Sequence, residues 1–583
     1  MSSTYEVTGQ GAEESPGPEI TPLSHTQQQL WFTEQIDPGQ SLYTEALAVR
    51  VRGALDTGAV ERAVREVLRR HEALRTVFPV VGDRPVQRVL PPGTPMSFLR
   101  RSVADVPAED REEALARLVT GFIEEPLDLT AQLLTRALLV SVAPDDRVLV
   151  VTLHHLVCDG LSGRVVFAEL GRLYEAFAAG LPSPLDEPEL QYADFTEWER
   201  GLLDSGYLDD DVEHWRERLA GVAPVLELPA RRARPAIKGV SGTRARFPLA
   251  DAGLRTRITA FCREHNVSLY TLTLAAFAAT VSRYTGQHDL VFGTLAANRA
   301  RSELEGVVGQ FTNTLPMRLD LTGDPTLLEL VDRAATTAED AIEHGQVSLG
   351  RIVELVAPRR DPSRNALVQH LFLTSGQPAS DATWGSASVT PFDVPRNRGR
   401  LDTITEVEER GAELVSWVEY DTDLFDHDEV EQLMRHFANA VAEWVGDPGL
   451  RVSELALLDR AEVEAHLVPL RAEALDAPAE LPASASGPAI TTADGSWTFE
   501  DLGALVSGVP GTATRVFLAD ADRGRAVAGV LAAAARGSDV VLCSCGAPCD
   551  CGCPAPAARE VVRLARGLAV ALWPERTRHV VLA

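Results

Sequence analysis

The sequence predicts a mixed α/β (α+β) protein that is divided into more than one compact unit. The chain has 583 residues, which is too long for a single core, so about two to four units are expected. Its content of 45% hydrophobic and 24% charged residues is ordinary for a globular protein. Strand-forming and helix-forming stretches are mixed along the chain. Val148–Leu153 is an unbroken run of β-formers, and Arg164–Ala178 reads as a helix.

The overall charge and the N-terminus narrow the class of protein further. A net charge of −29 argues against nucleic acid or an anionic membrane as the main partner. Residues 1–20 are polar, without the pattern of a signal peptide, and are expected to be a disordered tail. The longest apolar candidate, Ala526–Ala535, is too short to span a bilayer. We therefore expect a soluble cytoplasmic protein.

The first helices are predicted from capping and periodicity. Ser24 is placed to cap a helix from His25 to about Gln35. A second helix is expected from Asp56 to about Val77. Its apolar residues recur at helical spacing, at Val60, Ala63, Val64, Val67 and Leu68. Arg70 and Arg75 are then expected on a solvated face.

The later part of the chain indicates a second lobe. Residues 220–238 are rich in Pro and Arg, which is typical of a linker, and a lobe boundary is placed there. Leu254–Arg283 predicts a helix pair that breaks at His265-Asn266 and restarts behind a Ser268 cap. Further helices are expected at Trp198–Leu219 and Val430–Trp444, and a strand at Asp289–Thr294.

Candidate site residues follow the strand Val148–Leu153 directly. His154 and His155 come first, and because neighbouring strand residues point to opposite faces, the two imidazoles cannot share one role. Asp159 and Gly160 follow after a short turn. From the residues alone, a buried histidine and a helix-capping aspartate are the plainer interpretation. Cys158 is either a nucleophile or an inert small side chain, and we favour the second.

The spacing His-His-x-x-x-Asp-Gly at residues 154–160 resembles the active-site signature of the chloramphenicol acetyltransferase-like superfamily. This superfamily includes acyl-CoA transferases, wax-ester synthases and the condensation domains of nonribosomal peptide synthetases. Six further segments, in the right order, resemble condensation-domain motifs. They are Ser24–Trp31, Arg70–Thr76, Tyr192–Trp198, Ala297–Arg299, Gly309–Leu315 and Tyr420–Asp426. The chain is therefore identified as a condensation domain, and two of these motifs are most similar to the subtype joining an L-configured donor to an L-configured acceptor.

The resemblance implies an architecture. Two chloramphenicol acetyltransferase-like lobes, at residues 21–219 and 241–450, would form a V, each with a sheet backed by helices. Residues 220–240 would link them, and a tunnel between the lobes would receive a phosphopantetheine arm from each side. Ser162, Gln310 and Asn313 are candidates for lining that tunnel.

The resemblance also implies the roles of the motif residues. His155 would face the tunnel and either accept a proton or position the substrates. The Gly160 N–H would donate to the thioester oxygen. His154 would point into the core, and Asp159 would form a structural pair with Arg299 from the other lobe.

The implied reaction is attack of an acceptor amine or hydroxyl on a donor thioester. No Gly-Gly-x-Ser-type carrier motif occurs in the sequence. Donor and acceptor peptidyl carrier proteins would therefore be separate partners, unless the acceptor is a free small molecule, and no cofactor or metal is expected on this chain. The alternatives are an acyl-CoA-dependent acyltransferase, a non-catalytic docking module and an epimerisation domain. The intact site argues against the docking module, and the Ser24–Trp31 motif argues against epimerisation.

The C-terminal part resembles the beginning of an adenylation domain. After a linker at residues 451–487, the segments Trp497–Leu502 and Ala526–Leu542 are similar to that domain's first elements. No Gly/Ser/Thr-rich phosphate loop occurs there, so residues 488–583 are expected to be a truncated remnant that packs or docks. Five cysteines crowd into Cys543–Cys553. Their spacing differs from that of zinc knuckles, and a thiol-rich loop is favoured over a zinc site.

Overall fold

The computed structural model describes residues 20–36, 42–223, 225–299, 301–356, 361–376, 382–394, 397–458, 462, 488–492, 495–498, 515–518 and 539–542. The chain forms two compact units, Met1–Ser453 and Glu454–Ala583, and each is described by itself. The tail expected at residues 1–20 lies outside the described residues except for Ile20, and the Cys543–Cys553 cluster lies outside them entirely.

The first large sheet contains the strand that precedes the two histidines. Of the described strands, six form it, in the order β13-β14-β2-β8-β7-β6. Their bounds are β2 (Thr44–Arg52), β6 (Phe98–Ser102), β7 (Thr135–Ala143), β8 (Asp146–His154), β13 (Ala382–Trp384) and β14 (Ala387–Pro391). Strands β6 and β7 are parallel, and the other neighbours are antiparallel. The strand predicted at Val148–Leu153 is confirmed as part of β8.

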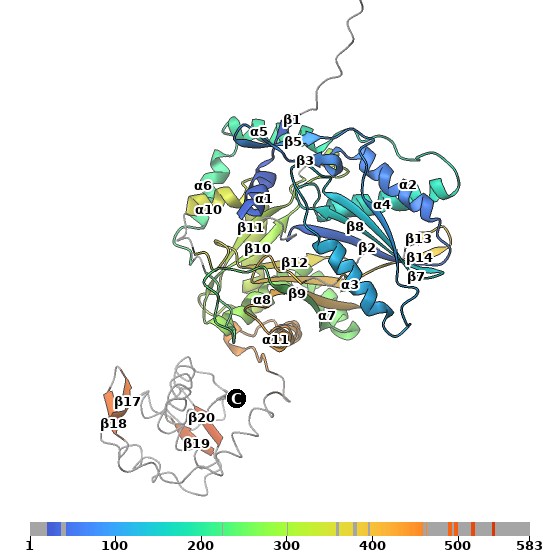
Figure 1. Ribbon diagram of the computed structural model, residues 1–583. Helices are drawn as coiled ribbons and strands as arrows, with labels where there is room; N and C mark the ends of the chain where they lie inside the picture. Colours follow the sequence, from blue (N-terminus) through green and yellow to red (C-terminus); the bar gives the residue numbers. More distant parts are fainter. Residues whose placement is uncertain are drawn as a thin grey trace, which may run out of the picture. The chain divides into compact units, whose positions relative to one another are not determined.

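Helices cover both faces of this sheet (Figure 1). One face packs against α2 (Thr57–Arg70) and α4 (Gly160–Ala178), and Leu149 and Val151 of β8 belong to that core. The other face packs against α3 (Arg111–Glu124). Burial on both faces explains why the β8 sequence is a continuous apolar run rather than an alternating one.

Strands β13 and β14 come from the second half of the chain, yet they extend the first sheet. Val389 of β14 is the register partner of Val51 of β2. Trp384 of β13 is 2% exposed and stacks on Tyr174 of α4, with 5.4 Å between the ring centroids. The two halves of the chain are thus joined by shared strands, an exchange that we did not expect from the sequence.

The second large sheet lies in the second half of the chain. Of the described strands, six form it, in the order β11-β10-β12-β15-β16-β9. Their bounds are β9 (Gly242–Ala250), β10 (Asp289–Ala296), β11 (Asn313–Asp320), β12 (His370–Ser375), β15 (Thr403–Arg410) and β16 (Glu413–Asp421). Helices in contact with it include α7 (Ala252–His265), α8 (Leu269–Thr285), α9 (Leu327–Glu343) and α11 (His427–Gly446).

Smaller elements complete the two units. A small sheet in the first unit is made of β1 (Ile20–Pro22), β3 (Thr76–Val77), β4 (Val80–Val81) and β5 (Arg84–Val89). The remaining helices are α1 (His25–Ile36), α5 (Tyr192–Asp204), α6 (Asp209–Arg218) and α10 (Leu349–Val356), with 3-10 turns at Glu72–Arg75, Ser302–Leu304 and Val452–Glu454. Among the described residues of the second unit, β17 (Pro488–Thr492) pairs with β18 (Gly495–Thr498), and β19 (Arg515–Leu518) pairs with β20 (Asp539–Leu542).

Most helix predictions are confirmed, and two are wrong in detail. The break between α7 and α8 falls at Asn266, whose φ of 53° ends the first helix in the left-handed region. The single helix expected at Trp198–Leu219 is instead α5 and α6, separated by a turn in which Gly206 has a φ of 73°. Helix α2 ends at Arg70, earlier than expected, because the backbone at His71 is extended.

The solvated face expected for Arg70 and Arg75 is wrong, because both side chains are buried. Arg70 donates to both carboxylate oxygens of Glu169 on α4, each at 3.1 Å. Arg75 donates to the Leu90 carbonyl oxygen and to Glu72. Each guanidinium has a carboxylate among its partners, which offsets the cost of burying a charged group.

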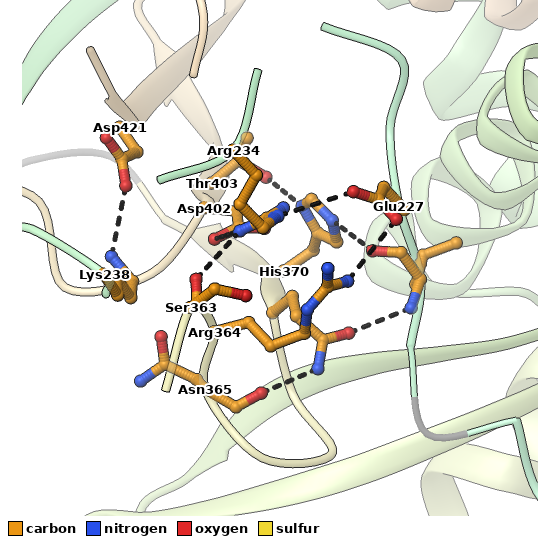
Figure 2. A network of polar contacts seen from close by, with 12 residues as sticks. Glu227, Arg234, Lys238, Ser363, Arg364, Asn365, His370, Asp402, Thr403 and Asp421 are labelled. Atoms are coloured by element: carbon orange, nitrogen blue, oxygen red, sulfur yellow. Dashed lines mark hydrogen bonds and ion pairs between the residues drawn. The ribbon is translucent and has the colours of Figure 1, made fainter. Parts of the chain in front are cut away.

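The Pro- and Arg-rich segment before β9 is held against the second half of the chain by a polar network (Figure 2). Arg234 forms an ion pair of 2.5 Å with Asp402, whose side chain is fully buried. Lys238 lies 3.3 Å from Asp421, and His370 contacts the Leu226 carbonyl oxygen at 2.9 Å. This network also fixes the backbone that leads into β15, which matters for the site described next.

Candidate active site

The two histidines lie where β8 ends and the turn after it begins. Residues of β8 with odd numbers, Leu149 and Val151 among them, face α2 and α4, whereas Val148 and Val150 face α3. His154 is the last strand residue, and the His155 N–H donates to the Tyr43 carbonyl oxygen at 2.8 Å. The two imidazoles have different partners: His154 contacts Glu34, and His155 contacts Glu45 and Arg400.

The His154 side chain is buried, and both of its ring nitrogens have partners within the protein. Its side chain is 2% exposed, and its Nδ1 accepts a hydrogen bond from the Leu156 N–H at 3.1 Å. The proton therefore sits on Nε2, which donates to the carboxylate of Glu34 at 3.3 Å. Burial lowers the pKa of His154 and outweighs the opposing effect of Glu34.

His155 carries a proton on Nδ1, the ring nitrogen that is a hydrogen-bond acceptor in His154. Its Nδ1 lies 3.2 Å from the Cys158 carbonyl oxygen, and because a carbonyl oxygen only accepts, Nδ1 carries the proton. The Nε2 atom is the other hydrogen-bonding position of the ring: it accepts a hydrogen bond when it carries no proton and donates one when it does. The side chain is 18% exposed, so a substrate has access to it.

Two charged side chains meet at Nε2 of His155. Oε1 of Glu45 on β2 lies 2.9 Å from Nε2, and Nη1 of Arg400 lies at the same distance of 2.9 Å. Arg400 Nη1 also donates to Glu45 Oε1 at 3.1 Å. The three groups form a closed triangle of a carboxylate, an imidazole and a guanidinium.

The surroundings of this triangle hold Arg400 in place. Glu419 of β16 accepts from the Arg400 backbone N–H at 3.1 Å, and its carboxylate lies 3.5 Å from Arg400 Nε. Tyr43 packs edge-on to His155 with 6.4 Å between the rings. Burial raises the pKa of the Tyr43 hydroxyl, the nearby Arg400 partly opposes the shift, and the phenol is therefore neutral at physiological pH.

Asp159 is the centre of a buried polar joint between the two halves of the chain. Its carboxylate lies 3.1 Å from Arg299 Nη2, and both side chains are at most 3% exposed. It also accepts from the N–H and hydroxyl of Ser162 at 2.8 and 2.7 Å, and from the Phe311 N–H at 3.2 Å. Asp159 thus caps α4 and binds the second half at the same time.

Arg299 and Ser162 complete this joint. Arg299 also donates to the carbonyl oxygens of Leu304 and Val307, and its guanidinium lies 3.9 Å from the centroid of the Phe311 ring. The Ser162 hydroxyl lies 2.9 Å from the Gly309 carbonyl oxygen and accepts from the Gly309 N–H at 3.0 Å. The expected contact between Asp159 and Arg299 is therefore present, as part of a larger network.

The opening motif joins the same interface. The Ser24 hydroxyl lies 2.8 Å from the Tyr192 hydroxyl, and Tyr192 donates to the Gln310 carbonyl oxygen. Gly309 packs flat on Tyr192, and a Cβ built on Gly309 would lie 1.9 Å from the ring. Segments near residues 24, 192 and 309, far apart in the sequence, are thus fitted to one another.

The three side chains expected to line a tunnel are in polar contacts within the protein. Ser162 belongs to the Asp159 joint and is fully buried. Asn313 is 3% exposed and donates to the carbonyl oxygens of Gly345 and Val347 at 2.9 and 2.8 Å. Gln310 is 9% exposed and donates to the Thr312 carbonyl oxygen at 3.2 Å. Their assignment to a tunnel stays a prediction.

Gly160 and Cys158 differ sharply in exposure. Gly160 is exposed, and a Cβ built there would meet nothing within 4 Å. As the first residue of α4, its N–H has no partner within the helix. Cys158 is 3% exposed, and burial raises the pKa of its thiol well above the usual value. That thiol stays protonated at neutral pH, which agrees with an inert side chain.

Glu45 and Arg400 are the site residues that we did not predict from the sequence. Arg400 is 245 positions from His155 and follows no motif that we recognised. Glu45 is the one acidic residue of β2, a strand that otherwise holds apolar residues, Thr44 and two arginines. Its antiparallel pairing with β8, in which Glu45 is opposite Leu153, brings it beside His155. A charged residue at the end of an apolar strand was the available clue.

The described part of the chain contains no group of three or more His, Cys, Asp or Glu side chains suited to a metal ion. Among the described helices, none has the length and the apolar character needed to cross a membrane.

The geometry fits what the comparisons with known proteins find. The family described as Condensation domain matches residues 18–467, so this chain belongs to the condensation-domain family. Chondramide synthase cmdD from Chondromyces crocatus is 34% identical over 463 residues. That match covers 79% of this chain, and the chain spans 12% of the length of the synthase.

Solved structures confirm the mixed α/β fold. The X-domain in the complex of the X-domain and OxyB from teicoplanin biosynthesis is 30% identical, with a TM-score of 0.67. It covers 78% of this chain and 100% of its own. A four-domain nonribosomal peptide synthetase bound to AMP and glycine is 20% identical, with a TM-score of 0.69. That second likeness covers 92% of this chain and 42% of the synthetase.

Proposed function

We propose that this chain catalyses acyl transfer from a carrier-protein thioester to an acceptor amine or hydroxyl, as the condensation step of nonribosomal peptide synthesis. The observation that carries this proposal is His155, which follows β8 directly, carries a proton on Nδ1 and has a partly exposed side chain. A neutral imidazole at this position can accept the proton that the nucleophile loses during attack. Asp159 and Arg299 hold the turn that carries it, and so act as structural residues.

The thioester oxygen needs a donor as negative charge develops on it. The Gly160 N–H is the candidate, because it starts α4, lacks a helical partner and has open space beside it. Donor and acceptor would reach the site as phosphopantetheine thioesters on carrier proteins, through a tunnel between the lobes. Ser162, Gln310 and Asn313 belong to the wall of that tunnel in this proposal. The acceptor is alternatively a free small molecule.

The subtype and the C-terminal region are further parts of the proposal. The forms of the motifs at Arg70–Thr76 and Tyr192–Trp198 support joining an L-configured donor to an L-configured acceptor. Residues 488–583 are proposed to be an adenylation-domain remnant. The likeness to the four-domain synthetase supports this, since it covers 92% of the chain, more than the condensation family match alone. Amino-acid-dependent exchange of pyrophosphate into ATP by the full chain would contradict the remnant.

Intact-mass spectrometry of carrier proteins tests the proposed function. A donor-loaded carrier, an acceptor-loaded carrier and this protein are mixed, and the mass of the acceptor carrier is followed. We expect it to rise by the mass of the donor acyl group. Turnover of acyl-CoA substrates without any carrier reaction would instead indicate an acyl-CoA-dependent acyltransferase.

The rival from a different class is a non-catalytic docking module. One comparison favours it, because the similar X-domain was solved in a complex with another protein, OxyB. That rival predicts a stable complex with a synthetase partner and no change in the mass of any carrier. The intact His155, Asp159 and Arg299 geometry favours catalysis.

A further inference from the structure

The triangle of Glu45, Arg400 and His155 identifies the chemical class of the acceptor. Nη1 of Arg400 lies 2.9 Å from His155 Nε2 and 3.1 Å from Glu45 Oε1. Nη1 of Arg400 therefore marks a position at which one cationic nitrogen contacts both His155 Nε2 and the Glu45 carboxylate. We propose that the acceptor enters as an ammonium ion, takes the place of Arg400 Nη1 and is bound by Glu45. This inference rests on the proposed function and narrows it to amide formation.

The hydrogen-bond count at this position favours an amine over a hydroxyl. An ammonium group has three donors, so it satisfies Nε2 of His155 and Oε1 of Glu45 at once. A hydroxyl group has one donor. At the same position it would leave one of the two acceptors facing its oxygen lone pairs, which is costly in a partly desolvated site. The side chain of Glu45 is 27% exposed, so a ligand can reach it.

Arg400 has a second carboxylate beside it, that of Glu419, with which its guanidinium can pair when it leaves Glu45. Its Nε lies 3.5 Å from Glu419, whose side chain is 6% exposed, and its backbone N–H is bonded to the same carboxylate. When the Arg400 guanidinium moves away from Glu45, it therefore still has Glu419 as an anionic neighbour. The backbone around Arg400 is fixed two residues later by the Arg234–Asp402 ion pair of Figure 2. Only the side chain has to move.

The proton balance of the step follows from this placement. The ammonium gives one proton to His155 Nε2, and the neutral nitrogen then attacks the thioester carbonyl carbon. The new C–N bond forms, the C–S bond breaks, and the departing sulfur takes the second proton from the nitrogen. The third proton stays on the amide. The imidazolium, whose Nε2–H donates to Glu45 at 2.9 Å, then releases its proton to solvent.

The test compares amine acceptors with their hydroxyl counterparts on one carrier protein. A set of amino acids and the matching 2-hydroxy acids is loaded on the same acceptor carrier, and kcat and KM for the acceptor carrier are measured. Wild type should react with the amino acids in preference to the hydroxy acids. Glu45→Gln keeps the shape but removes the charge. We expect it to lose about 10- to 100-fold in kcat/KM for the amino acids, chiefly through KM.

The control variants separate recognition from folding. Glu45→Gln should lower kcat/KM for the hydroxy acids by less than for the amino acids, since the hydroxy acids carry no cation and lose only the contact of Glu45 with the imidazolium. Glu45→Asp keeps the charge and should retain the preference for amines. Glu113→Gln, at an exposed helix position away from the site, should match wild type.

Three results would count against the proposal. An equal loss for both acceptor series in Glu45→Gln would mean that Glu45 acts through His155 or through the fold. If Glu45→Gln has the same kcat/KM for the amino acids as wild type, Glu45 does not bind the acceptor. If wild type prefers the hydroxy acids, the acceptor is not an amine. No transfer by wild type with either series would instead contradict the proposed function itself.

Discussion

His154 and His155 are neighbours in the sequence, yet their Nδ1 atoms have opposite hydrogen-bonding roles. A backbone N–H donates to Nδ1 of His154, whereas Nδ1 of His155 donates to a backbone carbonyl group. The first ring is thereby fixed as a buried donor to Glu34, and the second presents its Nε2 to Glu45 and Arg400. At the residue scale, the two rings therefore differ in which nitrogen bonds to the local backbone and which is left for a side-chain partner.

The Asp159–Arg299 pair gives the first prediction. Asp159→Ala leaves the Arg299 guanidinium buried without its counter-ion, so the free energy of unfolding should fall by about 3–5 kcal/mol. Urea unfolding measures this change. Glu113→Ala, which removes an exposed ion pair with Arg117 at 2.6 Å, is the matched control. It should cost less than about 1 kcal/mol. Similar losses in the two variants would contradict the structural role of Asp159.

The close packing of Gly309 on Tyr192 gives a second prediction. Gly309→Ala places a Cβ 1.9 Å from a ring that is 1% exposed, so the ring or the backbone must shift. We expect a loss of about 1–3 kcal/mol in the free energy of unfolding. Gly121→Ala, in α3 with open space around it, should instead stabilise the protein by about 0.5–1 kcal/mol. Equal free energies of unfolding for the two variants in urea would contradict the close packing of Gly309 on Tyr192.

At the scale of elements, helix α5 is tied to the start of α1 through Glu199. Its carboxylate accepts from the His25 N–H at 3.0 Å, at the first residue of α1. Burial raises the pKa of Glu199 from 4.5 to about 7, against the opposing effects of that hydrogen bond and of Arg200. The contact between these two helices should therefore depend on pH.

The sign of that pH dependence can be worked out. Between pH 4.5 and about 7, the folded protein keeps a proton on Glu199 that the unfolded chain has lost, so stability falls as pH rises through this window. Glu199→Gln removes the penalty. Its stability relative to wild type should improve by about 1–3 kcal/mol from pH 5 to pH 8 in urea unfolding. A relative stability that is the same at both pH values would contradict the raised pKa.

The accuracy of the sequence-based predictions also varied with the element. The strand β8 and the helices α1, α7, α8 and α11 were predictable, because caps and periodicity are local properties. The ends of α2 and the split between α5 and α6 were missed, since both depend on where the backbone turns. The burial of Arg70 was missed because its partner, Glu169, is 99 positions away on α4.

Prediction of the site from sequence had the same limit, because contacts between distant residues are not visible in local patterns. The motif spacing pointed to His155 and Asp159, and the family resemblance added Arg299. Glu45 and Arg400 were missed because they are 355 positions apart and meet at His155 only in the folded molecule. Strands β13 and β14 were missed for the same reason: an exchange between the two halves is a tertiary contact that a local pattern does not encode.

At the scale of the whole molecule, the two halves of the first unit are interdependent. Strand β14 pairs with β2, Arg299 pairs with Asp159, and Arg400 contacts both Glu45 and His155. All of these residues belong to the unit Met1–Ser453. Folding of the site should therefore be a property of this unit as a whole.

A shortened chain tests that expectation. Residues 1–467, the limit of the family match, should unfold in one thermal transition within about 2 °C of the corresponding transition of the full chain. The rate of acyl transfer should also be retained. Two separate transitions for the two halves, or loss of the transition on shortening, would contradict the interdependence of this unit.

The central claim is that His155 accepts the proton of the attacking nucleophile. The most direct test is the single-turnover rate of acyl transfer between two loaded carrier proteins, with wild type and with His155→Ala. A positioned general base contributes about 10²–10⁴-fold, so the variant should be slower by at least about 10²-fold, with little change in the free energy of unfolding. A variant that transfers the acyl group as fast as wild type would contradict the account.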